Sequence, residues 1–185
     1  HMDAVGYDLY CKMLSEAVRQ LKGEITEETY ATTVDLNIDA YIPASYIPNE
    51  YQKLDIYKRI AAIETEEEQD DMLEELIDRF GDPPRKVQQL LMIAHLKAKA
   101  HAAYIISVEQ KGEEYKFTMY EKAKVNVAKI PELLAKYKGE LTFKADTENP
   151  YFIYCRLRKN KKEKTEQILE NTGKIVEDIQ ELVEE

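Results

Sequence analysis

The local structure of residues 65–84, TEEEQDDMLEELIDRFGDPP, is more narrowly constrained by sequence than that of any other part of the chain. Thr65 and Glu68 have the spacing of a capping box, in which a hydroxyl and a carboxylate accept hydrogen bonds from the unpaired amides that begin a helix. Apolar residues then recur at the spacing of a helix that packs on a core, and Gly81 ends the pattern. These apolar residues are Met72, Leu73, Leu76, Ile77 and Phe80. The sequence therefore predicts an amphipathic helix from Thr65 to Gly81.

A second helix is expected directly after Gly81. Asp82 and Pro83 are predicted to supply its N-cap and its first-turn proline, and the helix itself is predicted from Pro84 to about Ala103. Its apolar stripe is unusually broad, which predicts burial on more than one side. The stripe consists of Val87, Leu90, Leu91, Ala94 and Ala98, widened by Ile93 and Leu96.

The residues before Thr65 predict two further helices and a strand. Helical spacing favours a helix over Gly6–Leu21, and alternation of apolar and polar residues favours a half-exposed strand over Thr33–Tyr41. Pro43 and Pro48 cannot donate to a strand ladder, so they place a turn there. The next helix is predicted over Glu50–Ile63. Its expected inward residues are Leu54, Tyr57, Ile60 and Ala61.

After Ala103 the apolar period changes to that of strands. Tyr104–Glu109 and Glu114–Tyr120 flank Lys111-Gly112, which is typical of a β-hairpin. A short helix is predicted over Ile130–Tyr137, ended by Gly139. The remaining elements are two more strands, Glu140–Ala145 and Tyr151–Leu157, and a last helix capped by Asn160 and Glu163, whose inward residues are Ile168, Thr172, Ile175, Ile179 and Leu182.

This order of elements predicts an α+β fold, with an N-terminal helical half followed by a mostly antiparallel sheet with flanking helices. His1 and Met2 are interpreted as residues left by cloning. Residues 3–185 are expected to form one domain with a possible subdivision near residue 103, between a mainly helical part, 3–103, and a mixed part, 104–185. The chain is expected to be a fragment of a longer protein.

Composition excludes several classes of function. The 26 basic and 36 acidic residues give a formal charge of -10, which argues against direct binding of nucleic acid. No apolar run approaches the length of a membrane span, so the chain is expected to be cytoplasmic, without membrane contact. Cys11 and Cys155 stand far apart, and His95 and His101 point to different helix faces, so no zinc site is predicted.

Acidic residues gather between Glu64 and Glu75, and paired carboxylates can bind a divalent metal or act as general acids and bases. A solvated helix face, with acids near the positive end of its dipole, explains them more simply. No phosphate-binding loop or nucleophile elbow occurs, so neither ATP hydrolysis nor other catalysis is predicted for this chain. A small acidic metal-dependent enzyme remains an alternative.

Glu75, Asp78 and Arg79 are the candidate protein-binding residues. They are three and four positions apart on the predicted helix, so they share one patch of its surface. The spacing also permits a simpler interpretation, because Glu75 and Arg79 form an i, i+4 pair that contributes about 0.3 to 0.5 kcal/mol to a helix.

An ordered series of short motifs resembles the C-terminal domain of bacterial transcription-repair coupling factors. The resemblance covers Val5 to about Leu91; beyond Ala103 it extends only to length and element order. One departure is Lys53, where the family usually has arginine. The motifs are Val5-Gly6-Tyr7-Asp8-Leu9-Tyr10, Tyr41-Ile42-Pro43, Tyr46-Ile47-Pro48, Tyr57-Lys58-Arg59-Ile60-Ala61, and Glu75-Leu76-Ile77-Asp78-Arg79-Phe80-Gly81 with Pro84.

The resemblance implies a non-catalytic regulatory domain of an ATP-dependent DNA translocase. In such a parent, ATP and magnesium serve the motor, this domain needs no cofactor, and the whole protein contacts RNA polymerase, DNA and UvrA. The domain would dock on an N-terminal UvrB-like module of the same chain, mask its UvrA-binding surface and restrain the motor. Glu75, Asp78 and Arg79 would supply polar contacts to that module. A generic protein-protein adaptor remains a further alternative.

Overall fold

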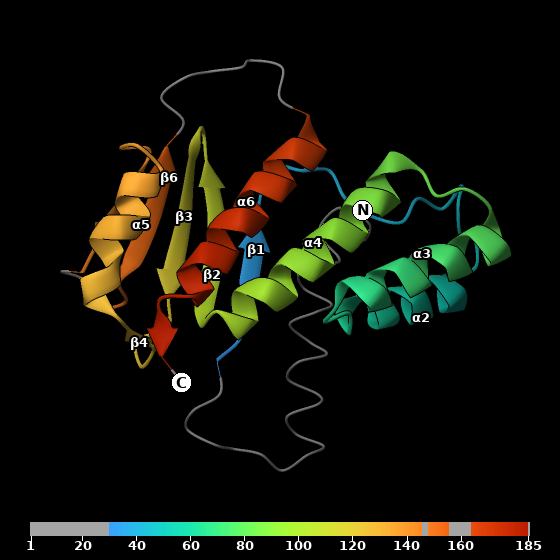
Figure 1. Ribbon diagram of the computed structural model, residues 1–185. Helices are drawn as coiled ribbons and strands as arrows, with labels where there is room; N and C mark the ends of the chain where they lie inside the picture. The colour runs from blue at the N-terminus through green and yellow to red at the C-terminus, as the bar shows by residue number, and fades with distance from the viewer. Residues whose placement is uncertain (1–29, 146–147, 156–163, 185) are drawn as a thin grey trace, which may run out of the picture. The chain divides into compact units, whose positions relative to one another are not determined.

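The computed structural model describes residues 30–145, 148–155 and 164–184 (Figure 1). The helix predicted over Gly6–Leu21 and the cap predicted at Asn160 and Glu163 lie outside these residues. The described chain divides into two compact units, which we name the helical unit and the sheet unit. The helical unit contains residues 30–31 and 38–98. The sheet unit contains residues 32–37 together with the described residues from Lys99 onward.

Helices α2, over Glu50–Ala61, and α3, over Glu66–Phe80, belong to the helical unit. Helix α4 follows over Arg85–Ala102; its residues up to Ala98 belong to the helical unit and those from Lys99 onward to the sheet unit. The side chain of Asn49 caps α2 by accepting from the amide of Gln52 at 3.0 Å. Before α2, the amides of Tyr46 and Ile47 both donate to the carbonyl of Pro43. These bonds form the turn that was predicted from Pro43 and Pro48. The core of the helical unit includes the fully buried residues Ile42, Ile47, Ile56, Ile60, Leu76, Val87 and Leu90.

The capping box that begins α3 is confirmed. Thr65 Oγ1 accepts from the amide of Glu68 at 3.1 Å, and the Glu68 carboxylate accepts at 2.9 Å from the amide of Glu64, one residue before the cap. At the other end Gly81 adopts φ +85°, a conformation that side-chain-bearing residues rarely take, and its amide bonds to the carbonyl of Ile77. Both ends of α3 are therefore fixed by its own sequence.

Within the described residues, the sheet unit contains a five-stranded sheet with the order β1-β2-β3-β6-β5. The pairs β2 with β3, β3 with β6 and β6 with β5 are antiparallel, whereas β1 pairs with β2 in parallel. A second sheet pairs β4 with β7. The strands are β1 Thr33–Asp35, β2 Ile105–Lys111, β3 Glu114–Met119, β4 Lys124–Val125, β5 Leu141–Lys144, β6 Tyr151–Cys155 and β7 Val183–Glu184.

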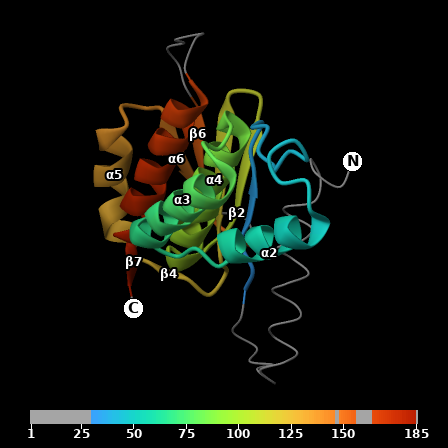
Figure 2. The ribbon, with the colours of Figure 1, turned by 90° about the vertical axis from the view of Figure 1, so that its right-hand side faces the viewer.

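Two helices, α5 over Ile130–Lys136 and α6 over Thr165–Gln180, cover the same face of the five-stranded sheet (Figures 1 and 2). A row of directly paired residues crosses this face from β1 to β5: Val34, Val108, Phe117, Phe152 and Phe143. Phe117 and Phe152 are fully buried, as are Val176 and Ile179 of α6. The predicted α+β class with a mostly antiparallel sheet is confirmed.

Three predicted details of the helices are wrong. Helix α4 begins at Arg85, not after an Asp82 cap, because a residue that precedes proline is disfavoured in helical conformation; the carbonyl of Pro84 accepts the first helical amides, those of Val87 and Gln88. Leu54 and Ile77 were expected inside but are 44% and 41% exposed. The side chain of Lys53 lies in the buried position on α2 instead.

The strand predicted over Thr33–Tyr41 is paired only from Thr33 to Asp35. Two residues later, the amide of Asn37 bonds to the side-chain oxygen of Gln110 at 3.0 Å instead of to a strand carbonyl. The alternation itself was correct, since Val34 is buried and its neighbours Thr33 and Asp35 are exposed.

Among the described helices, none combines the length and hydropathy needed to cross a bilayer.

Candidate interaction surface on helix α3

The three predicted site residues lie on the C-terminal half of α3, within the helical unit. Glu75 is half-buried, and Asp78 and Arg79 are exposed. On an α-helix Asp78 lies about 60° to one side of Glu75 and Arg79 about 40° to the other, because successive residues turn by about 100°. The buried residues Met72 and Leu76 lie about 60° and 100° from Glu75, on the same side as Arg79. The three residues therefore share one patch on the flank of α3, with Asp78 turned furthest from the buried side.

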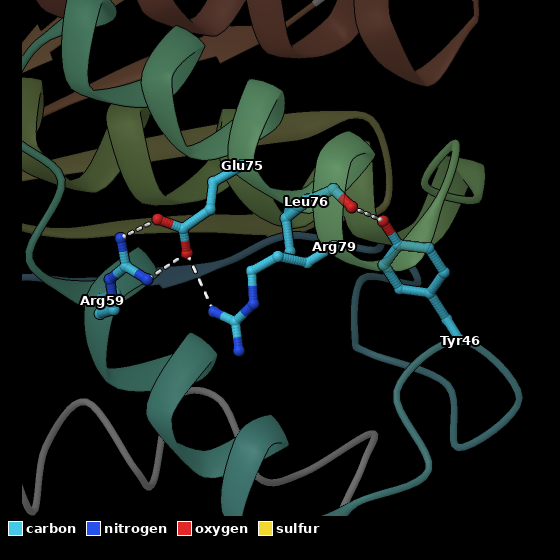
Figure 3. Close-up of polar contacts among 5 residues, drawn as sticks. All are labelled: Tyr46, Arg59, Glu75, Leu76 and Arg79. Carbon is cyan, nitrogen blue, oxygen red and sulfur yellow. Dashed lines mark hydrogen bonds and ion pairs between the residues drawn. The ribbon is translucent and has the colours of Figure 1, made fainter.

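Glu75 is held by two arginines (Figure 3). Arg59 of α2 donates through both terminal nitrogens, Nη2 to Oε1 at 2.7 Å and Nη1 to Oε2. Arg79 donates from Nη1 to the same Oε2 at 3.1 Å. A bidentate guanidinium fixes the plane of a carboxylate as well as its position. The pair between Arg59 and Glu75 also links α2 to α3.

The two guanidinium groups stabilise the ionised form of Glu75. The hydrogen bond from Arg59, with a smaller contribution from Arg79, holds the pKa of the Glu75 carboxyl below its ordinary value. Both members of the Arg59 pair are partly exposed, with 42% and 32% of their side-chain surface accessible. Solvent screening therefore limits the energy of the pair to about 1 kcal/mol at most.

Asp78 and Arg79 present unlike charges to solvent next to this anchored carboxylate. Asp78 forms no hydrogen bond or ion pair with any residue that the structure describes. Arg79 uses one terminal nitrogen on Glu75, and its guanidinium carbon lies 4.9 Å from the centre of the Phe80 ring. Arg79 is thus oriented by its own helix, while most of its donors point away from Glu75.

Tyr46 anchors the C-terminal end of α3. Its hydroxyl donates to the carbonyl of Gly81 at 2.7 Å. It also lies 3.2 Å from the carbonyl of Leu76, the contact drawn in Figure 3. Its ring lies 5.9 Å from that of Phe80. Burial raises the pKa of the Tyr46 hydroxyl, and Asp82 adds to the rise, so the donor proton is retained. These contacts hold the turn of α3 that carries Asp78 and Arg79.

Sequence reasoning named Glu75, Asp78 and Arg79 as candidates but did not name Arg59 or Tyr46, which contact α3 in the structure. Arg59 precedes Glu75 by 16 residues on another helix, so no periodicity within one element connects them. Both missed residues nevertheless stand in the short motifs that carry the family resemblance, which was the available signal.

Within the described residues, no group of three or more His, Cys, Asp or Glu side chains has the arrangement of a metal site.

Comparison with known proteins gives one consistent result. A family model described as "TRCF domain" matches residues 36–130. The transcription-repair-coupling factor of Staphylococcus haemolyticus (strain JCSC1435) is 44% identical over 124 residues, which are 66% of this chain and 11% of that protein. The corresponding protein of Bacillus subtilis (strain 168) is 37% identical over 143 residues, 76% of this chain and 12% of that protein. The chain thus spans about an eighth or less of these relatives.

A solved structure gives the same match. It is described as the crystal structure of the C-terminal domain of transcription-repair coupling factor, and it superposes with a TM-score of 0.63 at 26% identity. The superposition covers 82% of this chain and 95% of that domain. All three site residues, together with Arg59 and Tyr46, fall inside the segment that the family model matches.

Proposed function

Since the chain belongs to the TRCF domain family and corresponds to the C-terminal domain of a transcription-repair coupling factor, we propose that it is a non-catalytic regulatory domain that docks on a UvrB-like module of its parent protein. In the docked state it masks the UvrA-binding surface of that module and restrains an ATP-dependent DNA translocase. The motor, with its ATP and magnesium, and the contacts to RNA polymerase, DNA and UvrA belong to the rest of the parent.

The observation that carries this proposal is the patch of Glu75, Asp78 and Arg79. Arg59 fixes Glu75 by a bidentate contact, so the patch is ordered before any partner arrives. Asp78 and Arg79 are exposed and of opposite charge, which suits a partner surface that presents an arginine beside an acid. Polar contacts of this kind exchange readily with water, as a latch that must release requires.

The test is calorimetric titration of the domain with the purified UvrB-like module. Arg79→Glu reverses one charge of the patch, and we expect it to weaken docking about tenfold or more, because a like-charge contact replaces an attractive one. The matched control is Lys129→Glu, which makes the same change of charge at an exposed position in the sheet unit and is expected to leave the affinity unchanged. Equal affinities for wild type and Arg79→Glu would exclude the patch.

Masking is tested separately, by competition. UvrA is titrated onto the UvrB-like module with and without saturating domain, and we expect the domain to lower the apparent UvrA affinity. If the separated pieces show no docking, joining them through a flexible Gly/Ser linker supplies an effective concentration in the millimolar range. In the linked protein, UvrA affinity is compared with that of the UvrB-like module alone. Equal affinities, with no change on Arg79→Glu, would contradict the masking function.

A general adaptor function is the second candidate. Tyr51 is 86% exposed, and with Leu54 it forms an apolar pair on one flank of α2. Aromatic residues so exposed are common anchors of protein interfaces. The same titration decides between the candidates, because an adaptor with an unrelated partner gives no heat with the UvrB-like module and no competition with UvrA in the linked form.

A further inference from the structure

The two arginines at Glu75 make unequal contacts with it (Figure 3). Arg59 donates one terminal nitrogen to each carboxylate oxygen, Nη2 to Oε1 at 2.7 Å and Nη1 to Oε2. Arg79 donates only from Nη1, at 3.1 Å, to the oxygen Oε2 that Arg59 also uses. The plane of the carboxylate is therefore set by Arg59, which lies on another helix, and Arg79 makes the weaker contact.

Arg79 consequently keeps most of its donors clear of Glu75. A guanidinium has five N–H groups, and Arg79 forms no hydrogen bond with the described residues other than the one from Nη1. Its second terminal nitrogen points away from Glu75 in Figure 3. The Phe80 ring lies 4.9 Å from its guanidinium carbon, and 38% of its side-chain surface is accessible. Arg79 is therefore held near Glu75 while it can still donate to a partner.

The spacing of Glu75 and Arg79 also allows a closer contact than the one observed. Residues four positions apart are neighbours on a helix surface, and pairs of arginine with a carboxylate are frequently bidentate. In a bidentate pair, two parallel N–H groups of Arg79 would face Glu75 instead of solvent. Arg59 opposes this arrangement, because its own bidentate contact already occupies both oxygens. Arg59 and Arg79 thus compete for one carboxylate.

We propose that Arg59 is a positioning residue for docking, which keeps Arg79 available to the partner by occupying Glu75. This inference rests on the proposed function, and it adds a residue of α2 to a surface otherwise formed by α3. Arg59 need not touch the partner in this role. Without Arg59, Glu75 draws Arg79 into a bidentate pair, and the guanidinium must leave that pair before it can bind an acidic group of the partner.

The first experiment measures docking on the UvrB-like module by calorimetry, with Arg59→Gln introduced into three backgrounds. In the wild-type chain we expect Arg59→Gln to weaken docking about fivefold, the upper range for one exposed ion pair. In the Glu75→Gln and Arg79→Gln chains the same change is expected to have no further effect, because the competition no longer exists. No loss in the wild-type chain, or the same loss in all three chains, would overturn the proposal.

Lys58→Gln is the matched control, because it removes the same charge from the exposed neighbouring position of α2. Lys58 forms no hydrogen bond or ion pair with the part of the chain that the structure describes. We expect this variant to dock like wild type. A loss as large as that of Arg59→Gln would make net charge the cause and would overturn the role of Arg59.

A second measurement needs no partner, so it separates failure of this inference from failure of the proposed function. NMR of the free, isotope-labelled chain reports the rate of rotation about the Nε–Cζ bond of Arg79, which a bidentate contact slows. We expect slower rotation in Arg59→Gln than in wild type, and the wild-type rate again in the double variant Arg59→Gln/Glu75→Gln.

An unchanged rotation rate in Arg59→Gln would overturn the inference even where docking is observed. Slowed rotation, together with no docking by the wild-type chain, would instead contradict the proposed function. The docking role of Arg59 would then fall with it, although the competition for Glu75 would be confirmed.

Discussion

At the scale of single residues, Glu75 determines how the α3 patch responds to pH. It accepts hydrogen bonds from Arg59 and Arg79, and these contacts lower its pKa in the folded protein. The unfolded chain retains the ordinary value of about 4.5. Above that value the contribution of Glu75 to stability is fully present, and it is lost as the pH falls through the lowered, folded-state pKa.

Glu75→Gln is therefore expected to reduce the free energy of unfolding by about 0.5 to 1 kcal/mol at pH 7, because the removed charge is partly exposed. The difference from wild type should vanish in strongly acidic solution, where Glu75 is protonated in both states. Urea unfolding followed by circular dichroism at a series of pH values measures it. The control is Glu74→Gln, an exposed neighbour with no hydrogen bond to the described residues; a similar pH-dependent loss there would contradict the assignment.

At the scale of elements, the two ends of α3 are set by its own caps, and this explains why its bounds could be predicted so closely. Thr65, Glu68 and Gly81 act within a few residues of sequence, so their pattern can be recognised without knowledge of the fold. The first hairpin is of the same kind, since Gly112 takes φ +61° at its turn between β2 and β3. Both elements were predicted nearly to their ends.

Thr65→Ala is expected to destabilise the helical unit by about 1 kcal/mol, since the amide of Glu68 loses its partner at the start of α3. Amide hydrogen exchange should become faster in the first turn of α3. Thr65→Ser retains the hydroxyl and is expected to behave like wild type. If serine were as destabilising as alanine, the hydrogen bond would not be the cause.

The features that sequence did not reveal depend on contacts between elements. Which flank of an amphipathic helix is covered depends on its neighbour, so Leu54 and Ile77 continue their apolar stripes and yet lie largely in solvent. The same limit applies to Arg59, whose partner lies on another helix. At the candidate site, the composition of the patch on α3 was predictable from helical spacing, while the anchoring of that patch was not.

At the scale of the whole molecule, the path of the chain does not follow the division into units. Residues 32–37, with β1, belong to the sheet unit, although the next residues, 38–98, form the helical unit. Val34 is buried in β1 opposite Val108 of β2. A sequence boundary placed at one position cannot represent this arrangement, because pairing between distant segments sets it.

Val34→Ala is expected to reduce the free energy of unfolding by about 2 kcal/mol, because two buried methyl groups are removed and a small cavity remains. The loss should appear in the sheet unit: amide exchange in β2 and β3 should become faster, while exchange in the middle of α3 stays as in wild type. Thr33→Ala, at the exposed neighbouring position, serves as the control. An equal loss of protection in both units would contradict the division.

The parallel pairing of β1 with β2 also has a consequence for biosynthesis. Thr33 pairs with Ser107, so during translation β1 leaves the ribosome before all of α2, α3 and α4. It therefore remains unpaired until β2 has been synthesised. At 5 to 20 residues per second this delay is roughly 4 to 15 s, far longer than helices need to form. The nascent β1 is short, and its single buried residue stands between Thr33 and Asp35, so it offers little apolar edge to other nascent chains during the wait.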